Sequence, residues 1–287
     1  MDQSYYQPSG KAPVSGIIIS MLGGAASAIA LGIAYIALQW FIPIIYLNIL
    51  ICMGMSFGIA LVVNFLIKKT KIRNKGMAMV IALVAALVGL YAQWALFVSL
   101  MMNAEGGDLF VRSSFSLDTF ISVALNPKFV FQSMQDLNEV GTFSLKKDIV
   151  SGTFLWIIWA LEAIIIISLP VLLAPIQAGK PFSETNNDWM EEADGKDRPL
   201  QYITDIPTFK SSLEAGNYHI LDTLKQGNIS PTSYCKATLY SLAGDNDSYI
   251  TLDNITITTN SKGKQESSAK NVIKYKAIPS SIASKFI

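Results

Sequence analysis

The residue best placed to do chemistry is Glu162, because it lies inside a long apolar run, Trp156-Ile-Ile-Trp159-Ala-Leu-Glu162-Ala-Ile. A carboxylate at membrane depth is unfavourable unless it is paired or hydrated, and such groups serve ion pathways or bond helices together. Gln93 and Asn64 are the polar side chains of neighbouring apolar runs that could join it. We predict an intramembrane polar site of these three residues, and a conducting and a structural role both stay open.

A nucleophile with a base is the second kind of chemistry to consider. His219 is the only histidine, and Cys235 is the cysteine outside the apolar runs. Cys235 falls in a strand-like pattern, where a cysteine is typically a small buried apolar residue, so we expect no Cys-His dyad. Cys52 lies in an apolar run, and we expect no disulfide between the two cysteines. We predict no catalytic residue, no metal site and no cofactor.

Long apolar stretches surround these residues and define the fold class. Of the 287 residues, 51% are hydrophobic and only 15% are charged, against about 25% charged in ordinary soluble domains. A run of about 20 apolar residues matches the hydrocarbon thickness of a bilayer. We predict four transmembrane helices at residues 16–38, 43–67, 77–102 and 149–176. The predicted fold is a membrane all-α four-helix bundle with a C-terminal soluble α+β domain of short helices and about three antiparallel strands.

One cluster of positive charge sets the predicted orientation. It lies between the second and third apolar runs and consists of Lys68, Lys69, Lys71, Arg73 and Lys75. Because loops rich in Lys and Arg stay in the cytoplasm, we predict that both termini are cytoplasmic and that residues 103–148 are extracytoplasmic. Within that segment Asn126-Pro127 is a helix start and Gly141 a stop, so an amphipathic helix is predicted at 127–140.

A cleaved signal peptide is the alternative for the N-terminus. Lys11 precedes an apolar run in which Ala26-Ser27-Ala28 resembles a cleavage site. The run continues through Ile36, which makes it too long for a signal core. We therefore predict an uncleaved first helix that follows a cytoplasmic tail, residues 1–15.

Small residues recur every four positions in the first apolar run, which places them along one stripe of a helix. They are Gly16, Ser20, Gly24, Ala28 and Gly32, and the second run adds Gly54 and Gly58. In lipid, such stripes let helix backbones approach closely. We predict that they pack the helices of the bundle. A seam between two copies of the chain, which would make a homo-oligomer, is the alternative.

The last third of the chain is polar. Residues 177–198 are predicted to be an acidic linker, and residues 199–287 a cytoplasmic α+β domain. The spacing of apolar residues predicts helical structure at 208–226, split near Gly216. Segments rich in Thr, Ile, Tyr and Val predict strands at 233–242, 249–259 and 269–278, and a final helix is predicted at 280–286. The formal net charge of +1 leaves no basic surplus, so we expect no nucleic acid as partner.

Several short sequences resemble a known group of proteins. They are Tyr5-Tyr6 with Pro8 and Gly10, Pro43-Ile-Ile-Tyr46-Leu-Asn48, Arg73-Asn74, Asn126-Pro127, the stretch from Trp159 to Glu162, and Pro181-Phe182. Together they look like the uncharacterised family of four-span bacterial inner-membrane proteins, and the resemblance covers about residues 1–190. It implies a place in the bacterial inner membrane and no particular activity. Relatives place cysteines after the Pro-Phe pair, whereas this chain has Ser183 and Asn186, so no metal role carries over.

These patterns together predict a non-enzymatic integral membrane protein. Its helix bundle would anchor a cytoplasmic module that binds another protein, in an assembly or signalling role. The expected partners are the lipid bilayer and a protein that binds residues 199–287. The alternatives are an ion or small-solute pathway through the bundle that uses Glu162, and a membrane-bound enzyme.

Overall fold

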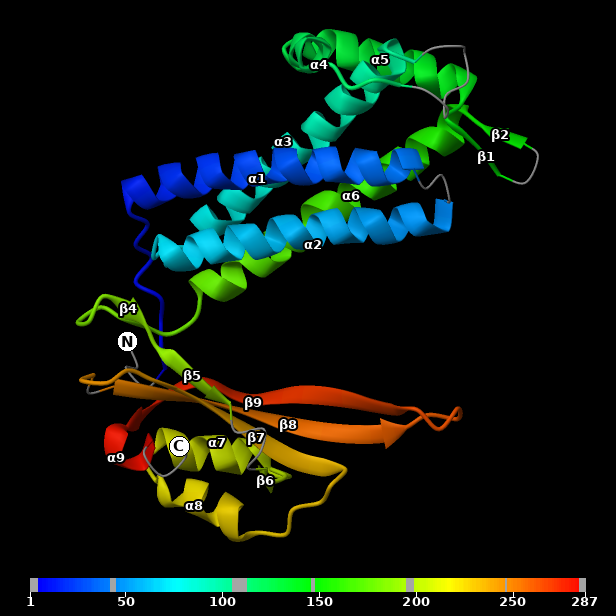
Figure 1. Cartoon of the computed structure of the whole chain (residues 1–287). Helices are drawn as coiled ribbons and strands as arrows, with labels where there is room; N and C mark the ends of the chain where they lie inside the picture. The colour runs from blue at the N-terminus through cyan, green and yellow to red at the C-terminus, as the bar shows by residue number, and fades with distance from the viewer. Residues whose placement is uncertain are drawn as a thin grey trace. The chain divides into compact units, whose positions relative to one another are not determined.

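The computed structural model describes residues 5–41, 45–104, 113–145, 148–194, 199–245 and 247–283. The chain forms two compact units, shown in Figure 1. One unit is helical and comprises Gly10–Gly179. The other comprises Lys180–Ile287 together with the N-terminal segment Met1–Ser9. Each unit is described by itself below.

Four long helices make up most of the helical unit. They are α1 (Val14–Phe41), α2 (Ile45–Lys69), α3 (Lys75–Met102) and α6 (Gly152–Ala178). By length and composition, all four are apolar enough to cross a membrane. Their bounds differ by a few residues from the predicted spans. The end of α1 and the start of α6 each differ by three residues, and α6 begins late because residues 149 and 150 belong to a short hairpin, β1 (Phe143–Leu145) with β2 (Asp148–Val150). Pro43, the first residue of the predicted second span, lies outside the described residues.

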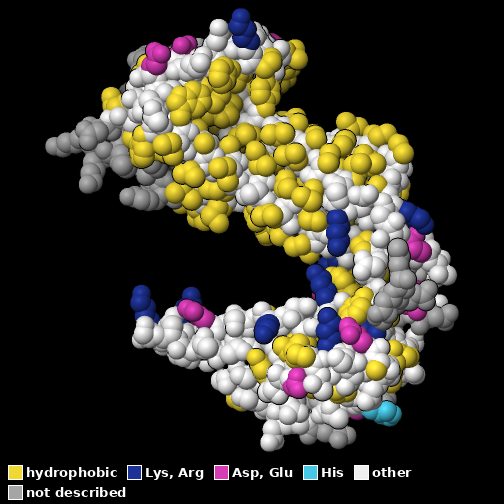
Figure 2. All heavy atoms as spheres, turned by 180° about the vertical axis from the view of Figure 1, so that it is seen from behind, with side chains coloured by type: hydrophobic (Ala, Val, Ile, Leu, Met, Phe, Trp, Pro, Cys, Tyr) yellow, Lys and Arg dark blue, Asp and Glu magenta, His cyan; other side chains and the backbone are white. Residues whose placement is uncertain are grey.

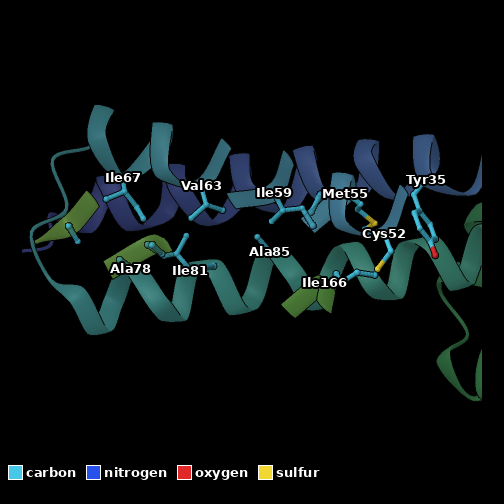
Figure 3. Close-up of a cluster of buried hydrophobic side chains, with 14 of the residues drawn as sticks. Tyr35, Cys52, Met55, Ile59, Val63, Ile67, Ala78, Ile81, Ala85 and Ile166 are labelled. Carbon is cyan, nitrogen blue, oxygen red and sulfur yellow. The ribbon is translucent and has the colours of Figure 1, made fainter. Parts of the chain in front are cut away.

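The four helices pack around a shared apolar core. Helix α1 packs against α2 and α3, and α6 packs against the same two helices. Figure 3 shows the core, in which Ile59 and Val63 of α2 meet Ile81 and Ala85 of α3 and Ile166 of α6. The side chain of Asn74 begins α3 by accepting a hydrogen bond from the Met77 N–H.

Two shorter helices, α4 (Leu117–Ala124) and α5 (Pro127–Val140), pack on the C-terminal part of α3. Helix α5 has the range that the sequence predicts, with Asn126 as its cap and Gly141 as its end. Its inner face is not purely apolar, since Val140 is exposed and Asn138 is buried. Asn138 is buried because its side-chain amide donates a hydrogen bond to the Gly152 carbonyl. The sequence analysis missed α4.

The outer surface of the helical unit is largely apolar. Figure 2 shows hydrophobic side chains spread over the visible face of this unit. The exposed large apolar residues on the four long helices include Ile18, Leu22, Leu50, Met53, Phe57, Leu61, Phe65, Val80, Leu87, Ile157, Leu161, Ile164 and Leu172. A water-soluble monomer rarely exposes a contiguous apolar patch larger than a few hundred Å².

The C-terminal unit is built on a five-stranded antiparallel sheet. Its strands are β5 (Glu191–Asp194), β6 (Leu200–Gln201), β7 (Ser233–Ser241), β8 (Asp247–Thr259) and β9 (Gln265–Pro279). The order is β5-β7-β8-β9, and β6 pairs with the other end of β7. A separate hairpin, β3 (Phe182–Ser183) with β4 (Asp188–Trp189), precedes the sheet.

Helices α7 (Ile206–Glu214) and α8 (His219–Gln226) cover one face of this sheet. Phe209, Leu213 and Leu221 pack there on alternate residues of the strands, such as Leu239 and Ile250. The period of two along each strand puts these apolar side chains on the helix-covered face. Helix α9 (Ser280–Ala283) follows β9, and the rest of the predicted final helix lies outside the described residues.

Two boundaries in the C-terminal third need correction. The predicted linker, 177–198, contains the end of α6 and three strands, β3, β4 and β5. Strand β5 belongs to the sheet because Glu191–Asp194 pairs with Ser241–Thr238 of β7, a long-range pairing that an acidic composition hides. The sheet therefore has β5 and β6 in addition to the three predicted strands.

The N-terminal segment also belongs to the C-terminal unit. Tyr5 forms a β-bridge with Lys276 of β9, and the Tyr6 N–H donates to the Tyr275 carbonyl at 2.9 Å. The Tyr5 hydroxyl donates to Glu214 of α7 at 2.8 Å. The predicted tail, residues 1–15, is therefore divided: residues 5–9 belong to the C-terminal unit, and α1 begins within its last residues.

Candidate functional site

Glu162 lies on the side of α6 that packs against α2. The Cys52 thiol of α2 donates a weak hydrogen bond to the Glu162 backbone carbonyl, with 3.7 Å between sulfur and oxygen. The side chain of Glu162 is partly exposed. Within the described residues, no hydrogen bond joins its carboxylate to Gln93 or Asn64.

The α2–α6 contact continues one turn further at a proline. Pro170 has no N–H, so the carbonyl of Ile166, four residues earlier, loses its partner within the helix. The Ser56 hydroxyl of α2 lies between two carbonyls, at 2.7 Å from that of Ile165 and 3.2 Å from that of Ile166, so the freed carbonyl receives the longer contact of a shared donor. Helix α6 therefore continues through Pro170 to Ala178 instead of ending at the proline.

Gln93 is buried in α3 beside α1. A Cβ atom added to Gly32 of α1 would lie 3.4 Å from the Gln93 nitrogen, which shows how closely the two backbones approach. The side-chain oxygen of Gln93 is buried and has no hydrogen-bond partner among the residues that the structure describes. The next residue, Trp94, stacks edge-on against Trp159 of α6 with ring centroids 4.8 Å apart. Because Trp159 is one turn from Glu162, Gln93 and Glu162 lie at about the same level of the bundle.

Asn64 does not share this level. It lies three helical turns, or about 18 Å, from Cys52 along α2, and Cys52 is the residue that contacts Glu162. Within the described residues, the side-chain oxygen of Asn64 is also buried without a hydrogen-bond partner. The structure thus brings Glu162 and Gln93 to one layer and leaves Asn64 toward the other end of α2.

Further polar groups in this half of the bundle escaped the sequence analysis. In the described part of the chain, the side-chain oxygens of Asn48 and Ser99 are buried without a partner. The Gln39 amide donates to the Tyr35 hydroxyl at 2.6 Å. Asn48 is one turn from Cys52, so a polar ladder on α2 could have been extended to it. These groups place several uncompensated oxygens in the half of the bundle that contains Glu162.

The basic cluster lies at the α2–α3 turn and has several local roles. Lys68 and Lys69 end α2, where positive charge is favourable to the helix dipole. Arg73 is buried, and its backbone N–H donates to the Lys11 carbonyl. Lys75 passes over Gly179 at the end of α6, where a Cβ atom would lie 2.6 Å from the lysine Cε. Lys71 takes a left-handed conformation, with φ of 56°, which tightens the turn.

The stripe of small residues on α1 faces its helix neighbours. Gly16 lies against Thr70, and Gly24 lies against Ala85 and Val63. Ala28 approaches Gly89 so closely that a Cβ atom on that glycine would lie 3.1 Å from the alanine Cβ. Ser20, on the same stripe, is hydrogen-bonded to Thr70 at 3.0 Å.

The glycines of α2 separate into two kinds. Gly58 packs against Leu31, since a Cβ atom there would lie 3.1 Å from the leucine methyl carbons. Gly54 is exposed, and no atom of the described residues lies within 4 Å of its Cβ position. The prediction that Gly54 packs helices within the bundle is therefore wrong, because positions four residues apart differ by about 40° around a helix and only Gly58 reaches α1.

The two residues considered for a dyad are far from catalytic geometry. Cys235 is fully buried in the core of the C-terminal unit, and burial raises the pKa of its thiol to about 12. The side chain of His219 is 95% exposed at the start of α8, 4.0 Å from the Asp222 carboxylate. A nucleophilic thiolate needs a lowered pKa and a nearby base, and Cys235 has the opposite environment.

A buried amide connects the sheet to the loop before α7. The Asn254 side chain donates to the Ile203 carbonyl at 2.8 Å and accepts from the Ile203 N–H at 3.1 Å. Asn254 is 1% exposed, so both of its polar atoms are satisfied inside the core. This residue is structural.

Comparisons with protein-family models, with curated proteins and with solved structures find no match to this chain.

Proposed function

We propose that the chain is a multi-pass integral membrane protein that anchors a protein-interaction module, the C-terminal unit, at the cytoplasmic face of the bacterial inner membrane. The observation that carries the proposal is the contrast between the surfaces of the two units. The four long helices expose large apolar residues over their length, whereas the C-terminal unit encloses its own apolar core between α7, α8 and the sheet.

Lipid is the expected surrounding of the helical unit. Residues such as Leu22, Phe57 and Leu172 are each more than half exposed and come from three different helices. In water, an apolar surface of this extent would cause aggregation. Inside a bilayer the same residues face acyl chains, and the inward small residues supply the close helix packing that membrane bundles use.

Two features support a common, cytoplasmic side for both ends of the chain. Tyr5 and Tyr6 pair with β9, so the segment before α1 and the unit after α6 are on one side. Four crossings between them agree with this arrangement. The basic cluster at the α2–α3 turn would lie on that side as well, which favours the cytoplasm.

The interaction role is inferred from the sheet. Strand β9 is an edge strand, and over residues 265–271 its side chains are exposed. An open strand edge is a common docking element for partner proteins. The proposal is that this unit works by binding and that the membrane helices hold it in place.

Site-directed labelling tests the topology. Asn228→Cys places an exposed thiol in the C-terminal unit, whereas the native Cys52 and Cys235 are buried. In intact cells a membrane-impermeant maleimide should leave this variant unlabelled, and lysis should expose it. Labelling in intact cells would overturn the orientation, and a wild-type chain that stays dissolved without detergent would overturn membrane insertion.

The binding role requires its own test. A chain that ends at residue 179 keeps the whole helical unit. We expect this chain to insert into the membrane but to lose the cellular function. Asn254→Ala is a milder variant that weakens only the C-terminal core. Full function of the truncated chain would contradict the proposal.

A second candidate function is favoured by one observation, the unpartnered oxygen of Gln93 at the level of Glu162. A buried amide oxygen at the same level of the bundle as a carboxylate could take up a proton or a cation during passage through the bundle. Proteoliposome flux should then fall at least tenfold in Glu162→Gln and also fall in Gln93→Leu. Equal flux in wild type and Glu162→Gln would remove this candidate.

A further inference from the structure

We propose that the chain pairs with a second copy of itself through the outer edge of β9, with a two-fold axis at Ser268, so that the two sheets join edge to edge. This inference rests on the proposed function, because it names a second copy as a partner of the C-terminal unit. Charge complementarity along the edge selects both the partner and the register.

The free edge has two clear ends. Toward the hairpin it ends at the turn that Asn260 closes by donating its N–H to the Lys264 carbonyl at 2.9 Å. Toward the other end, Tyr5 and Tyr6 already occupy the edge at Lys276 and Tyr275. Within the described part of the chain, residues 265–271 pair on one side only, with β8.

The same stretch is the regular part of β9. Gln265 to Asn271 pair in unbroken register with Thr259 to Asp253, and the register shifts only beyond Asn271. All side chains from Gln265 to Asn271 are exposed. A regular, exposed edge strand presents a row of backbone N–H and C=O groups that an identical strand can satisfy.

The hydrogen-bond pattern tells which residues point outward. Hydrogen-bonded and non-hydrogen-bonded pairs alternate along an antiparallel ladder. Since Asn260 and Lys264 form a hydrogen-bonded pair, residues 266, 268 and 270 also direct their backbone groups toward β8. Residues 265, 267, 269 and 271 therefore direct their N–H and C=O groups to the open edge.

A two-fold axis at Ser268 uses these outward groups fully. Ser267 of one copy then pairs with Ala269 of the other, and Gln265 pairs with Asn271, in hydrogen-bonded pairs. At the centre of the proposed strand pair, next to the two-fold axis, the side chains are small: Ser267, Ser268 and Ala269.

Charge distinguishes this register from its neighbours. With the axis at Ser268, Glu266 of each copy stands directly opposite Lys270 of the other, which gives two attractive cross-strand pairs. Moving the axis to residue 267 sets Lys264 opposite Lys270. Moving it to residue 269 sets Glu266 opposite Val272 and Lys270 opposite Ser268, which leaves no attractive pair. Moving it to residue 266 or 270 sets Glu266 or Lys270 against its own copy. Like charges opposite each other are unfavourable, so the charged residues of this edge disfavour the neighbouring registers and favour the register with its axis at Ser268.

Cysteine cross-linking provides the sharpest test, and it uses the full chain in native membranes. Ser268→Cys puts a thiol on the axis, opposite its own copy in a non-hydrogen-bonded pair, where Cα atoms lie about 4.5 Å apart. Mild oxidation should convert most of this variant to a disulfide-linked dimer. The matched control is Thr258→Cys, equally exposed and on the same face of the hairpin, but on β8. Its two copies would be three strand spacings, or about 14 Å or more, apart and should cross-link at least tenfold less.

Charge reversal tests the register independently. Glu266→Lys and Lys270→Glu should each reduce cross-linking of the Ser268→Cys chain at least tenfold, because each puts two like-charged pairs in place of the attractive ones. The combination of both changes should restore it. If Glu266→Lys acted only by removing the hydrogen bond from the Asn260 amide, adding Lys270→Glu would not restore cross-linking, since position 266 would still carry lysine.

Equal cross-linking at positions 268 and 258, or no recovery in the double charge reversal, would overturn the proposal. Either result would leave membrane anchoring and binding of a different protein intact. Failure of the proposed function would instead appear as external labelling of the C-terminal unit or as full function without it. The two failures are therefore distinguishable.

Discussion

The close contact between α1 and α3 can be tested by adding a single methyl group at Gly32. An alanine Cβ there would lie 3.0 Å from the Gly89 carbonyl oxygen and 3.4 Å from the Gln93 nitrogen. Both atoms belong to the backbone of α3, so neither can swing aside as a side chain would. The two helices must separate, and the core of Figure 3 between them loses contact.

The magnitude follows from two opposing terms. Overpacking of a tight core costs about 1–3 kcal/mol, while replacing a mid-helix glycine by alanine stabilises the helix by about 1 kcal/mol. Gly32→Ala should therefore lower the free energy of unfolding by about 0–2 kcal/mol. Gly54→Ala is the matched control, because nothing lies within 4 Å of its Cβ position and only the helix term acts.

Comparing the two variants removes the helix term, so Gly32→Ala should be about 1–3 kcal/mol less stable than Gly54→Ala. The measurement is thermal unfolding of the purified protein in detergent, followed by tryptophan fluorescence. For a unit of this size, a difference of 2 kcal/mol separates the two midpoints by about 4–8 °C. Equal stability of the two variants, or a more stable Gly32→Ala, would refute the close α1–α3 packing.

Two hydrogen-bonded sites and one buried thiol provide further tests. Ser56→Ala should lower the free energy of unfolding in detergent by about 1 kcal/mol in the wild type. In a chain that also carries Pro170→Ala, the restored N–H of residue 170 pairs with the Ile166 carbonyl, so the loss should be smaller. A double-mutant cycle measures the difference. Asn254→Ala leaves both backbone groups of Ile203 unpaired and should destabilise the C-terminal unit by about 2–4 kcal/mol in urea unfolding. Burial raises the pKa of the Cys235 thiol from 9.0 to about 12, so this thiol should resist maleimide at pH 8 until the C-terminal unit unfolds. For the same reason, the stability that the neutral thiol contributes should be lost as the pH rises from about 9 to 12.

Each of these has an outcome that would count against it. Additive effects of Ser56→Ala and Pro170→Ala would mean that the hydroxyl does not serve the proline-freed carbonyl. Asn228→Ala, at an exposed position, is the control for Asn254→Ala, and similar losses in both would remove the argument from the buried amide. Rapid labelling of Cys235 in the folded protein would show that the core of the C-terminal unit is open.

Much of the fold could be read from local pattern. The apolar runs predicted the four long helices, and the Asn126-Pro127 start with Gly141 predicted α5, because capping residues act on their own helix. Helix α4 escaped detection because it has only eight residues, too few for a clear periodic signal. Strand β5 escaped because its four residues, Glu191–Asp194, are mostly acidic and are held by pairing with β7.

The candidate site shows the limit of local pattern more sharply. Gln93 and Asn64 looked equivalent as partners of Glu162, since both are polar residues in apolar helices. Which of them reaches the level of Glu162 depends on the relative register of neighbouring helices. That register is set by contacts such as Cys52 with Glu162 and Trp94 with Trp159, which no single helix encodes.

The amino-acid sequence by itself determined which segments are helices or strands and which residues are apolar, because these properties depend on neighbours a few positions away. Only the tertiary structure decided that Gly58 packs while Gly54 faces outward, that Ser56 completes the carbonyl freed by Pro170, and that Tyr5 extends the sheet beside β9. The physical reason is that close packing and backbone pairing join atoms far apart along the chain. Their partners are chosen by the whole fold.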